Sequence, residues 1–398
     1  MPGAGARLLA VSSFFDTHRG GLEIVAGRLA RELAGRGFQV TWLATDATPA
    51  PEVPPVRAVP VRAWNIAERR LGVPFPLPSP RALARLAGEV KACDVVLLHD
   101  GLYATSVAAL IAARLHGKPV IIVQHIGAVP YRSPLLRGLM ALANRLVARP
   151  MLAAADQVVF ISAFVREFFA AVRFRRPPLL IFNGVDTEVF RPGEPAARGS
   201  TRERLGLPAH GPVALFVGRF VEKKGLHLLR RTAALRPDLT FAFAGWGVID
   251  PTTWGLPNVR VFSGLQGESL AELYRVSDAL VLPSRGEGFP LVIQEALACG
   301  LPVVCNTESC TADPAAAPLL RGVELGEHDA PGHPEAIAAA LDAALAAPGD
   351  AAARLALVRE RYAWSAVAER YASLIHQLVD APAAAGPARA ASPLEPAR

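Results

Sequence analysis

The sequence predicts an α/β protein with two doubly wound parallel sheets that face each other across a cleft. The chain has 398 residues, more than a single domain of ordinary size contains. Short apolar runs alternate with helical stretches, a pattern typical of βαβ units and a parallel sheet. The alternation breaks at Arg175-Arg-Pro-Pro178 and then starts again. Two series of βαβ units separated by a break predict two domains.

The N-terminal domain is expected to span residues 1–178. Its strands are short apolar runs, and its helices carry apolar residues at helical spacing. We expect strands at 8–13, 40–44, 95–98, 120–124 and 157–161, and helices at 22–36, 102–116, 134–147 and 163–171.

The C-terminal domain is expected to span residues 179–362 and to repeat the pattern. It begins with a strand at 179–182 and the turn Asn183-Gly-Val-Asp186. Further strands are expected at 213–217, 240–244, 279–282 and 303–305, and helices at 226–235 and 270–276. An amphipathic helix follows at 363–380. The tail 381–398 is rich in Ala and Pro without periodicity, so we expect it to be disordered.

Composition narrows the class of protein. Hydrophobic residues make up 52% of the chain and charged residues 19%, which indicates a globular protein with many buried strands. We find no run of about 20 apolar residues without a charge or a breaker, and no charged leader before a long apolar region. We therefore expect a cytoplasmic protein. Cys299, Cys305 and Cys310 lack the paired spacing of a zinc site, so we expect no metal there.

The positive charge leaves three kinds of partner to consider. A net charge of +7 and a pI near 9.6 suit nucleic acid, an anionic membrane or a phosphorylated ligand. Basic residues do not interleave with aromatic ones and no nucleic-acid-binding motif occurs, so nucleic acid is not expected. Basic clusters at 132–149 and 166–176 suit peripheral contact with an anionic membrane. An ordinary amphipathic helix with its Phe residues in the core is the alternative at 166–176.

Two carboxylates mark the segment Ser284-Arg-Gly-Glu-Gly-Phe-Pro-Leu-Val-Ile-Gln-Glu-Ala-Leu-Ala-Cys-Gly300. A helix is expected from Pro290 to about residue 298, and its free N–H groups would bind an anion. Glu287 and Glu295 would lie about 12 Å apart on a helical path, which is too far for a hydrolytic acid/base pair. That distance suits hydroxyl groups at the two ends of a nucleotide-sugar. Two solvated glutamates are the alternative. The donor-binding residues expected here are Gly288, Phe289, Pro290, Leu291 and Glu295.

Fixed cations are expected after the strand at 213–217. The text Gly218-Arg-Phe-Val-Glu-Lys-Lys-Gly225 places Arg219 and Lys224 there, with Lys223 as a neighbour that could take the place of Lys224. No D-x-D pair for a metal occurs in the chain. An arginine fork and a lysine would then stabilise the charge of a leaving diphosphate. A solvated loop is the alternative.

Further candidates lie in the first domain. Gly20 and Gly21 stand just before a helix, where glycines let the backbone approach an anion, although a tight turn needs glycine too. His125 follows the strand at 120–124, and ligands gather beyond the carboxyl ends of parallel strands. His99 and Asp100 end the neighbouring strand in the same way, so the two histidines compete for one role.

These segments resemble the retaining glycosyltransferases of family 4, which share the GT-B fold and an E-x7-E motif. The resemblance rests on Glu287-x7-Glu295 with its flanking text, on Ala-Cys-Gly-Leu-Pro-Val-Val304, and on the text from Leu180 to Pro192. It implies that Glu287 and His125 contact the donor sugar and Glu295 the ribose. It assigns the donor diphosphate to Gly218, Arg219 and Lys224, and donor phosphate or acceptor to Gly20-Gly21. It also implies that the last helix braces the first domain.

The chain departs from the family at two places. Gly245-Trp-Gly247 replaces a glycine turn followed by a polar residue, and Trp246 could stack on a base or pack between the domains. Asn306-Thr-Glu-Ser-Cys-Thr-Ala-Asp313 stands where the family shows a glycine pair before an acidic residue. The family pattern therefore does not predict how this segment forms the rear wall of the donor pocket.

The resemblance implies a hexosyltransferase that needs neither metal nor cofactor. It would move a sugar with retention from a nucleotide-sugar to a saccharide or lipid-linked acceptor, as in envelope polysaccharide, lipopolysaccharide or glycolipid synthesis. The alternatives are a non-catalytic nucleotide-sugar-binding regulatory module, and a phosphorylase or epimerase on the same fold. The motif does not specify the donor sugar, its base or the acceptor.

Overall fold

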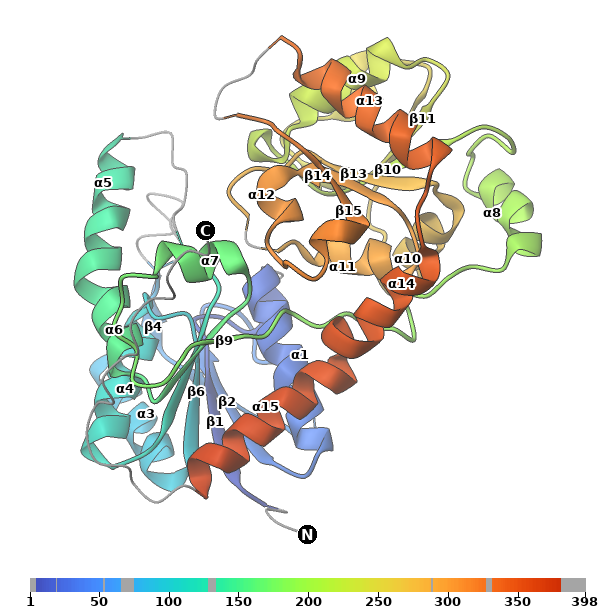
Figure 1. Ribbon diagram of the computed structural model, residues 1–398. Helices are drawn as coiled ribbons and strands as arrows, with labels where there is room; N and C mark the ends of the chain where they lie inside the picture. The colour runs from blue at the N-terminus through green and yellow to red at the C-terminus, as the bar shows by residue number, and fades with distance from the viewer. Residues whose placement is uncertain are drawn as a thin grey trace, which may run out of the picture. The chain divides into compact units, whose positions relative to one another are not determined.

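The computed structural model describes residues 5–18, 20–52, 54–65, 75–127, 134–287, 289–326 and 331–380. The chain divides into two compact units, each with its own parallel sheet (Figure 1). The N-terminal unit comprises Met1–Ile161, Val165–Ile181 and Ala368–Arg398, and the C-terminal unit comprises Ser162–Phe164 and Phe182–Val367. The predicted α/β class with two parallel sheets is confirmed.

The N-terminal unit contains a 7-stranded parallel sheet with the order β3-β2-β1-β6-β7-β8-β9. Its strands are β1 (Arg7–Val11), β2 (Gln39–Thr45), β3 (Arg57–Val61), β6 (Val95–His99), β7 (Val120–Gln124), β8 (Gln157–Phe160) and β9 (Leu179–Leu180). A small antiparallel pair joins β4 (Ala63–Trp64) to β5 (Leu77–Pro78). The strand order reverses between β1 and β6, as in doubly wound folds.

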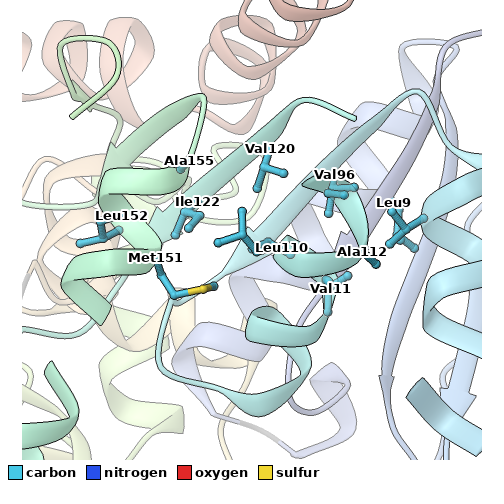
Figure 2. Packing of buried hydrophobic residues seen from close by; sticks show 14 of the residues in the cluster. Leu9, Val11, Val96, Leu110, Ala112, Val120, Ile122, Met151, Leu152 and Ala155 are labelled. Atoms are coloured by element: carbon cyan, nitrogen blue, oxygen red, sulfur yellow. The ribbon is translucent and has the colours of Figure 1, made fainter. Parts of the chain in front are cut away.

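Helices precede, connect and follow the strands of the N-terminal sheet. They are α1 (Gly21–Gly35), α3 (Pro80–Ala92), α4 (Ala104–Leu115), α5 (Pro134–Ala143), α6 (Arg149–Ala154) and α7 (Ala163–Phe168). One continuous core joins one face of the sheet to α3, α4 and α6; Figure 2 shows Leu110 of α4 and Met151 of α6 among sheet residues such as Val96 and Ile122. Every residue of β6 and β7 is buried, because helices or loops cover both faces of a central parallel strand.

The C-terminal unit contains a 6-stranded parallel sheet with the order β12-β11-β10-β13-β14-β15. Its strands are β10 (Val213–Phe220), β11 (Thr240–Gly247), β12 (Val259–Phe262), β13 (Ala279–Leu282), β14 (Val303–Asn306) and β15 (Leu320–Val323). Its helices are α8 (Arg198–Arg204), α9 (Leu226–Leu235), α10 (Gly267–Val276), α11 (Leu291–Ala298), α12 (Thr307–Cys310), α13 (His333–Ala346) and α14 (Ala351–Leu357). The order reverses between β10 and β13, so this sheet repeats the topology of the first.

The last helix, α15 (Trp364–Val379), returns to the N-terminal unit. Its residues from Ala368 onward cluster with that unit. Glu369 lies 3.7 Å from Arg36, which caps α1, and the ring of His376 lies 5.1 Å from that of Phe38. These contacts agree with the expected bracing role of this helix.

The structure corrects several details of the sequence analysis. The strand expected at 179–182 to open the second half is β9, which pairs with β8 at the edge of the first sheet. The strand β3 and the helix α3 were missed. The helix expected at 134–147 ends at Ala143, where a π-helical turn, Asn144–Ala148, leads into α6. The tail 381–398 lies outside the described residues.

Candidate functional site

The point of strand reversal in the C-terminal unit brings two functional loops together. β10 pairs with β13, although the chain between them forms other strands and helices. The loop after β10 contains a turn of 3-10 helix, Glu222–Lys224, and the loop after β13 carries Glu287. The backbone N–H of Arg285 donates to the carbonyl of Lys223 at 3.0 Å, which joins the loops directly. In doubly wound sheets ligands bind at this point.

Lys224 and Glu287 form an ion pair between these loops. The ammonium Nζ lies 2.6 Å from Oε1 and 2.8 Å from Oε2 of the carboxylate, and both side chains are 13% exposed. Nζ of Lys223 lies 3.8 Å from Oε1 of Glu287. Burial lowers the pKa of Lys223, and the charges of Lys224 and Arg219 lower it further although Glu287 raises it. The two lysines of this loop therefore both lie beside the carboxylate of Glu287.

Gly225 allows these loops to approach. It follows Lys224 with φ 72°, a left-handed conformation. A Cβ at this position would lie 2.7 Å from the carbonyl oxygen of Pro283, at the start of the loop after β13. Any other residue would strain the backbone and collide with that carbonyl. The position of Lys224 relative to Glu287 thus depends on a glycine at 225.

Gly218 and Arg219 lie within β10, not after it. The expected strand at 213–217 continues to Phe220, and Arg219 pairs with Trp246 of β11. The Arg219 side chain is exposed, and its charge acts on Lys223. Trp246 is 61% exposed.

The helix expected after Glu287 is α11, which begins at Leu291. Pro290 is its N-cap residue, with φ −61° and ψ 134°, rather than a residue of its first turn. Phe289 is buried and its ring lies 5.5 Å from those of Phe182 and Tyr362, so its side chain belongs to the core. The first N–H groups of a helix have no partner within it and can bind an anion; in α11 that of Ile293 donates to the carbonyl of Pro290 at 3.0 Å. The predicted Gly288 lies outside the described residues.

Glu295 projects from α11 and is held by a residue that the sequence analysis did not connect with it. The hydroxyl of Tyr274, in α10, donates to Oε2 of Glu295 at 2.8 Å. Burial raises the pKa of Glu295 to about 7, and the hydrogen bond from Tyr274 acts in the opposite direction. Burial also keeps the pKa of Tyr274 well above its usual value, so Tyr274 stays a donor.

The segment that departs from the family supplies Glu308. This residue, in α12, accepts a hydrogen bond from the backbone N–H of Gly286 at 3.0 Å. The side chain of Asn306 donates to the carbonyl of Ser284 at 3.3 Å. Both bonds hold the loop that carries Glu287. Burial and the charge of Glu287 raise the pKa of Glu308. Asp313 has a different role, because it accepts hydrogen bonds from Arg361 and Tyr362.

In the N-terminal unit the two candidate histidines form a pair. Nδ1 of His99, at the end of β6, lies 3.3 Å from Nε2 of His125, which follows β7. Burial lowers the pKa of His99 to about 3, and burial and His99 keep the pKa of His125 well below its usual value. Both imidazoles are therefore neutral at neutral pH.

Asp100 fixes the backbone beside this pair. Its carboxylate accepts hydrogen bonds from the N–H groups of Leu102 and Ile126 and from the side chain of Gln124, at 3.1–3.2 Å. Asp100 is the one non-glycine residue in the described part of the chain with a positive φ, 73°. Burial raises its pKa to about 6. A positive φ in a residue other than glycine strains the backbone. Such strain persists where surrounding contacts impose it, which is common at functional sites.

Gly20 and Gly21 begin α1, as the sequence suggested. Gly20 is the N-cap residue with φ −80° and ψ 151°, so its backbone is ordinary. A Cβ there would lie 2.0 Å from Oε2 of Glu23, the end of a flexible side chain, which would have to move. The buried carboxylate of Glu23 thus lies at the helix N-terminus where an anion was expected.

The described residues show no metal site at these loops. No group of three or more His, Cys, Asp or Glu side chains within the described ranges could hold a metal ion. A cavity of about 370 Å³ lies elsewhere in the C-terminal unit, between residues 191–195, α8 and the end of α10. None of the predicted site residues lines it.

Two family models match the chain, one in each half. Residues 19–189 match Glycosyltransferase Family 4, and residues 198–356 match Glycosyl transferases group 1. D-inositol 3-phosphate glycosyltransferase 1 of Catenulispora acidiphila is 33% identical over 360 residues, which cover 81% of this chain and 82% of that protein. The enzyme of the same name from Frankia alni is 30% identical over 329 residues, with 72% and 77% covered.

Solved structures with this fold cover nearly the whole chain. Sucrose-phosphate synthase from Thermosynechococcus elongatus superposes with a TM-score of 0.70 at 21% identity, covering 94% of this chain and 99% of that one. Anabaena Alr3699/HepE in complex with UDP-glucose superposes with a TM-score of 0.66 at 17% identity, covering 94% and 100%. The two parallel-sheet units thus form a GT-B fold. The chain belongs to the family 4 glycosyltransferases and is an enzyme of the hexosyltransferase type.

Proposed function

We propose that this enzyme transfers a sugar from a nucleotide-sugar to an acceptor hydroxyl, with retention at the anomeric carbon and without a metal or other cofactor. The observation that carries the proposal is the ion pair of Lys224 and Glu287 at the reversal point of the C-terminal sheet. A relative named for sugar transfer and a neighbour solved with UDP-glucose support it.

The donor diphosphate would bind where positive charge and free N–H groups meet. Arg219 and Lys224 attract phosphate oxygens, and the N-terminus of α11 offers its unpaired backbone donors. A phosphate that takes over Lys224 releases the carboxylate of Glu287, which then accepts hydrogen bonds from sugar hydroxyls. Glu295, held by Tyr274, accepts from the ribose hydroxyls.

Departure of the diphosphate develops negative charge, which Arg219 and Lys224 stabilise in place of a metal. The acceptor attacks the face that the diphosphate leaves, and a phosphate oxygen takes its proton. His125 is neutral and therefore interacts with the sugar through hydrogen bonds and not as a cation. Gly20 and Gly21 contact the donor phosphate or the acceptor.

The acceptor is a saccharide or lipid-linked hydroxyl, and the reaction belongs to the synthesis of an envelope polysaccharide, lipopolysaccharide or glycolipid. The relatives' name adds a phosphorylated inositol as an acceptor to test. The enzyme would act in the cytoplasm, with peripheral contact to an anionic membrane.

The proposal is tested by the melting temperature of the protein against a panel of nucleotide-sugars, followed by product analysis with each acceptor. A donor at about 100 times its Kd stabilises the fold by about 2.7 kcal/mol and raises the melting temperature. Lys224→Ala should lose that response. Binding without donor consumption across the acceptors would indicate a regulatory module. Consumption with inorganic phosphate, or without an acceptor, would indicate a phosphorylase or an epimerase.

A further inference from the structure

Helix α5 carries an exposed row of leucines. Leu135, Leu139, Leu142 and Leu146 are 80%, 60%, 52% and 63% exposed. Their spacing of four, three and four residues places them on one face of α5 and the π-helical turn after it. We call these four residues the leucine face. A globular protein buries most of its leucines, so an ordered row of exposed ones indicates a binding surface.

The π-helical turn and α6, which follow α5, fix this run of helix to the N-terminal unit. Asn144 and Ala148 are buried, and the side chain of Asn144 donates to the carbonyl of Gly127 at 3.3 Å. Met151 and Leu152 of α6, which continues the same run of helix, belong to the core of the unit (Figure 2). Figure 1 shows α5 at the edge of the unit, continuing from α6. The leucine face is thus held in place but left uncovered.

The charged residues on the helical run that carries the leucine face are all positive. Arg137 and Arg145 are exposed, and Arg149 is partly exposed. Residues 134–155 contain no Asp or Glu. No ion pair joins these three arginines to another residue in the described part of the chain. An apolar face with arginines and no acids is typical of helices that lie at the surface of an anionic membrane.

We propose that the leucine face docks on an anionic lipid surface, with the leucines in the acyl boundary and Arg145 and Arg149 on lipid phosphates. A second copy of this chain fits less well, because a symmetric contact through α5 would bring the arginines of both copies together. No single helix among the described residues is long and apolar enough to cross a membrane. The inference specifies the membrane contact of the proposed function, but it stands on exposure and charge and not on sugar transfer.

The test is flotation of the whole protein with vesicles of phosphatidylcholine alone or mixed with phosphatidylglycerol. The parent should float only with the anionic vesicles and should be released by salt. The double variant Leu139→Ser/Leu142→Ser should lower the partition coefficient about tenfold or more, since two side chains lose their apolar contact. Arg145→Gln should lower it about fivefold. Leu235→Ser, at an exposed leucine of α9 in the other unit, is the matched control and should float like the parent.

Three results would overturn the inference. They are a parent that does not float with anionic vesicles, variants that float as well as the parent, and a parent dimer that the leucine variants convert to monomer without any vesicle binding. The last result would assign the surface to a second copy. Donor-induced melting shifts measured on the same variants separate the two proposals, because these substitutions change no residue of the donor site.

Discussion

The loop that carries Glu287 is held by two residues from other segments, one that pairs with the carboxylate and one that accepts from the backbone beside it. The carboxylate of Glu287 pairs with Lys224, while the adjoining N–H of Gly286 is held by Glu308. The charge of Glu287 therefore competes with a donor phosphate for the same ammonium. Because of this competition, a mutation of Glu287 should affect nucleotide binding and sugar transfer differently.

Glu287→Gln should separate nucleotide binding from sugar transfer. The amide leaves Lys224 without its anionic partner, so a nucleoside diphosphate should bind at least as tightly as to the parent. Transfer should fall about 100-fold or more, since the sugar loses a charged acceptor. Calorimetric titration with the diphosphate and initial rates with the nucleotide-sugar measure both quantities. Weaker diphosphate binding with an unchanged rate would contradict the assignment.

Glu308 should act as a positioning residue. Glu308→Ala removes the acceptor for Gly286 N–H and should lower kcat about tenfold, because small displacements of positioned groups slow catalysis strongly. Glu308→Gln keeps a carbonyl oxygen and should recover most of the rate. Comparison of kcat and KM for both variants provides the check. Equal losses in the two variants would show that the charge of Glu308, and not its hydrogen bond, matters.

Donor affinity should rise as the pH increases through about 7. Glu295 accepts ribose hydroxyls as a carboxylate, and burial raises its pKa to about 7 from an ordinary 4.5. The hydrogen bond from Tyr274 lowers that pKa, so Tyr274→Phe should move the midpoint to a higher pH. Glu295→Gln should remove the midpoint altogether. Donor Kd values measured from pH 6 to 8 test this, and a midpoint that moves down in Tyr274→Phe would exclude it.

At the level of elements, the approach of the loops after β10 and β13 rests on Gly225. Its φ of 72° resembles the φ of 75° at Gly264, but a Cβ at Gly225 would meet Pro283 whereas one at Gly264 would have open space around it. Substitution of Gly264 therefore tests backbone strain alone, whereas substitution of Gly225 tests backbone strain together with a steric clash.

Gly264→Ala should cost about 1 kcal/mol, the usual penalty of a left-handed conformation. Gly225→Ala should cost about 2 kcal/mol more, because the clash forces the loops apart. Urea unfolding of both variants measures the difference. Equal free energies of unfolding would show that the loops tolerate the separation, and donor binding should then be unaffected as well.

The sequence predicted helices and strands correctly where their hydrophobic pattern is strong. The apolar strands β6, β7 and β13 and the helix α9 are strongly patterned, and the sequence located them closely. The strand β3 was missed because Pro60 interrupts its pattern, which an edge strand tolerates. β9 was assigned to the wrong sheet, because two residues carry no local signal of which strand they pair with.

At the scale of the whole molecule, a motif in the sequence identified some residues of the site, whereas others are brought to the site only by the folding of the sheet. The resemblance pointed to Lys224 and Glu287, and the structure brings them into contact although 63 residues separate them. Tyr274 and Glu308 carried no such motif. Their roles depend on α10 packing beside α11 and on β14 pairing with β13, which only the folded sheet reveals.

The most direct measurement is sugar transfer from the nucleotide-sugar selected by melting, with and without a chelator, by the parent and by Arg219→Ala. The proposed function predicts a product that keeps the anomeric configuration of the donor, at a rate that the chelator leaves unchanged. Loss of the guanidinium should lower the rate about 100-fold or more. A rate that requires a divalent metal, an inverted product, or an unchanged rate in Arg219→Ala would contradict the account.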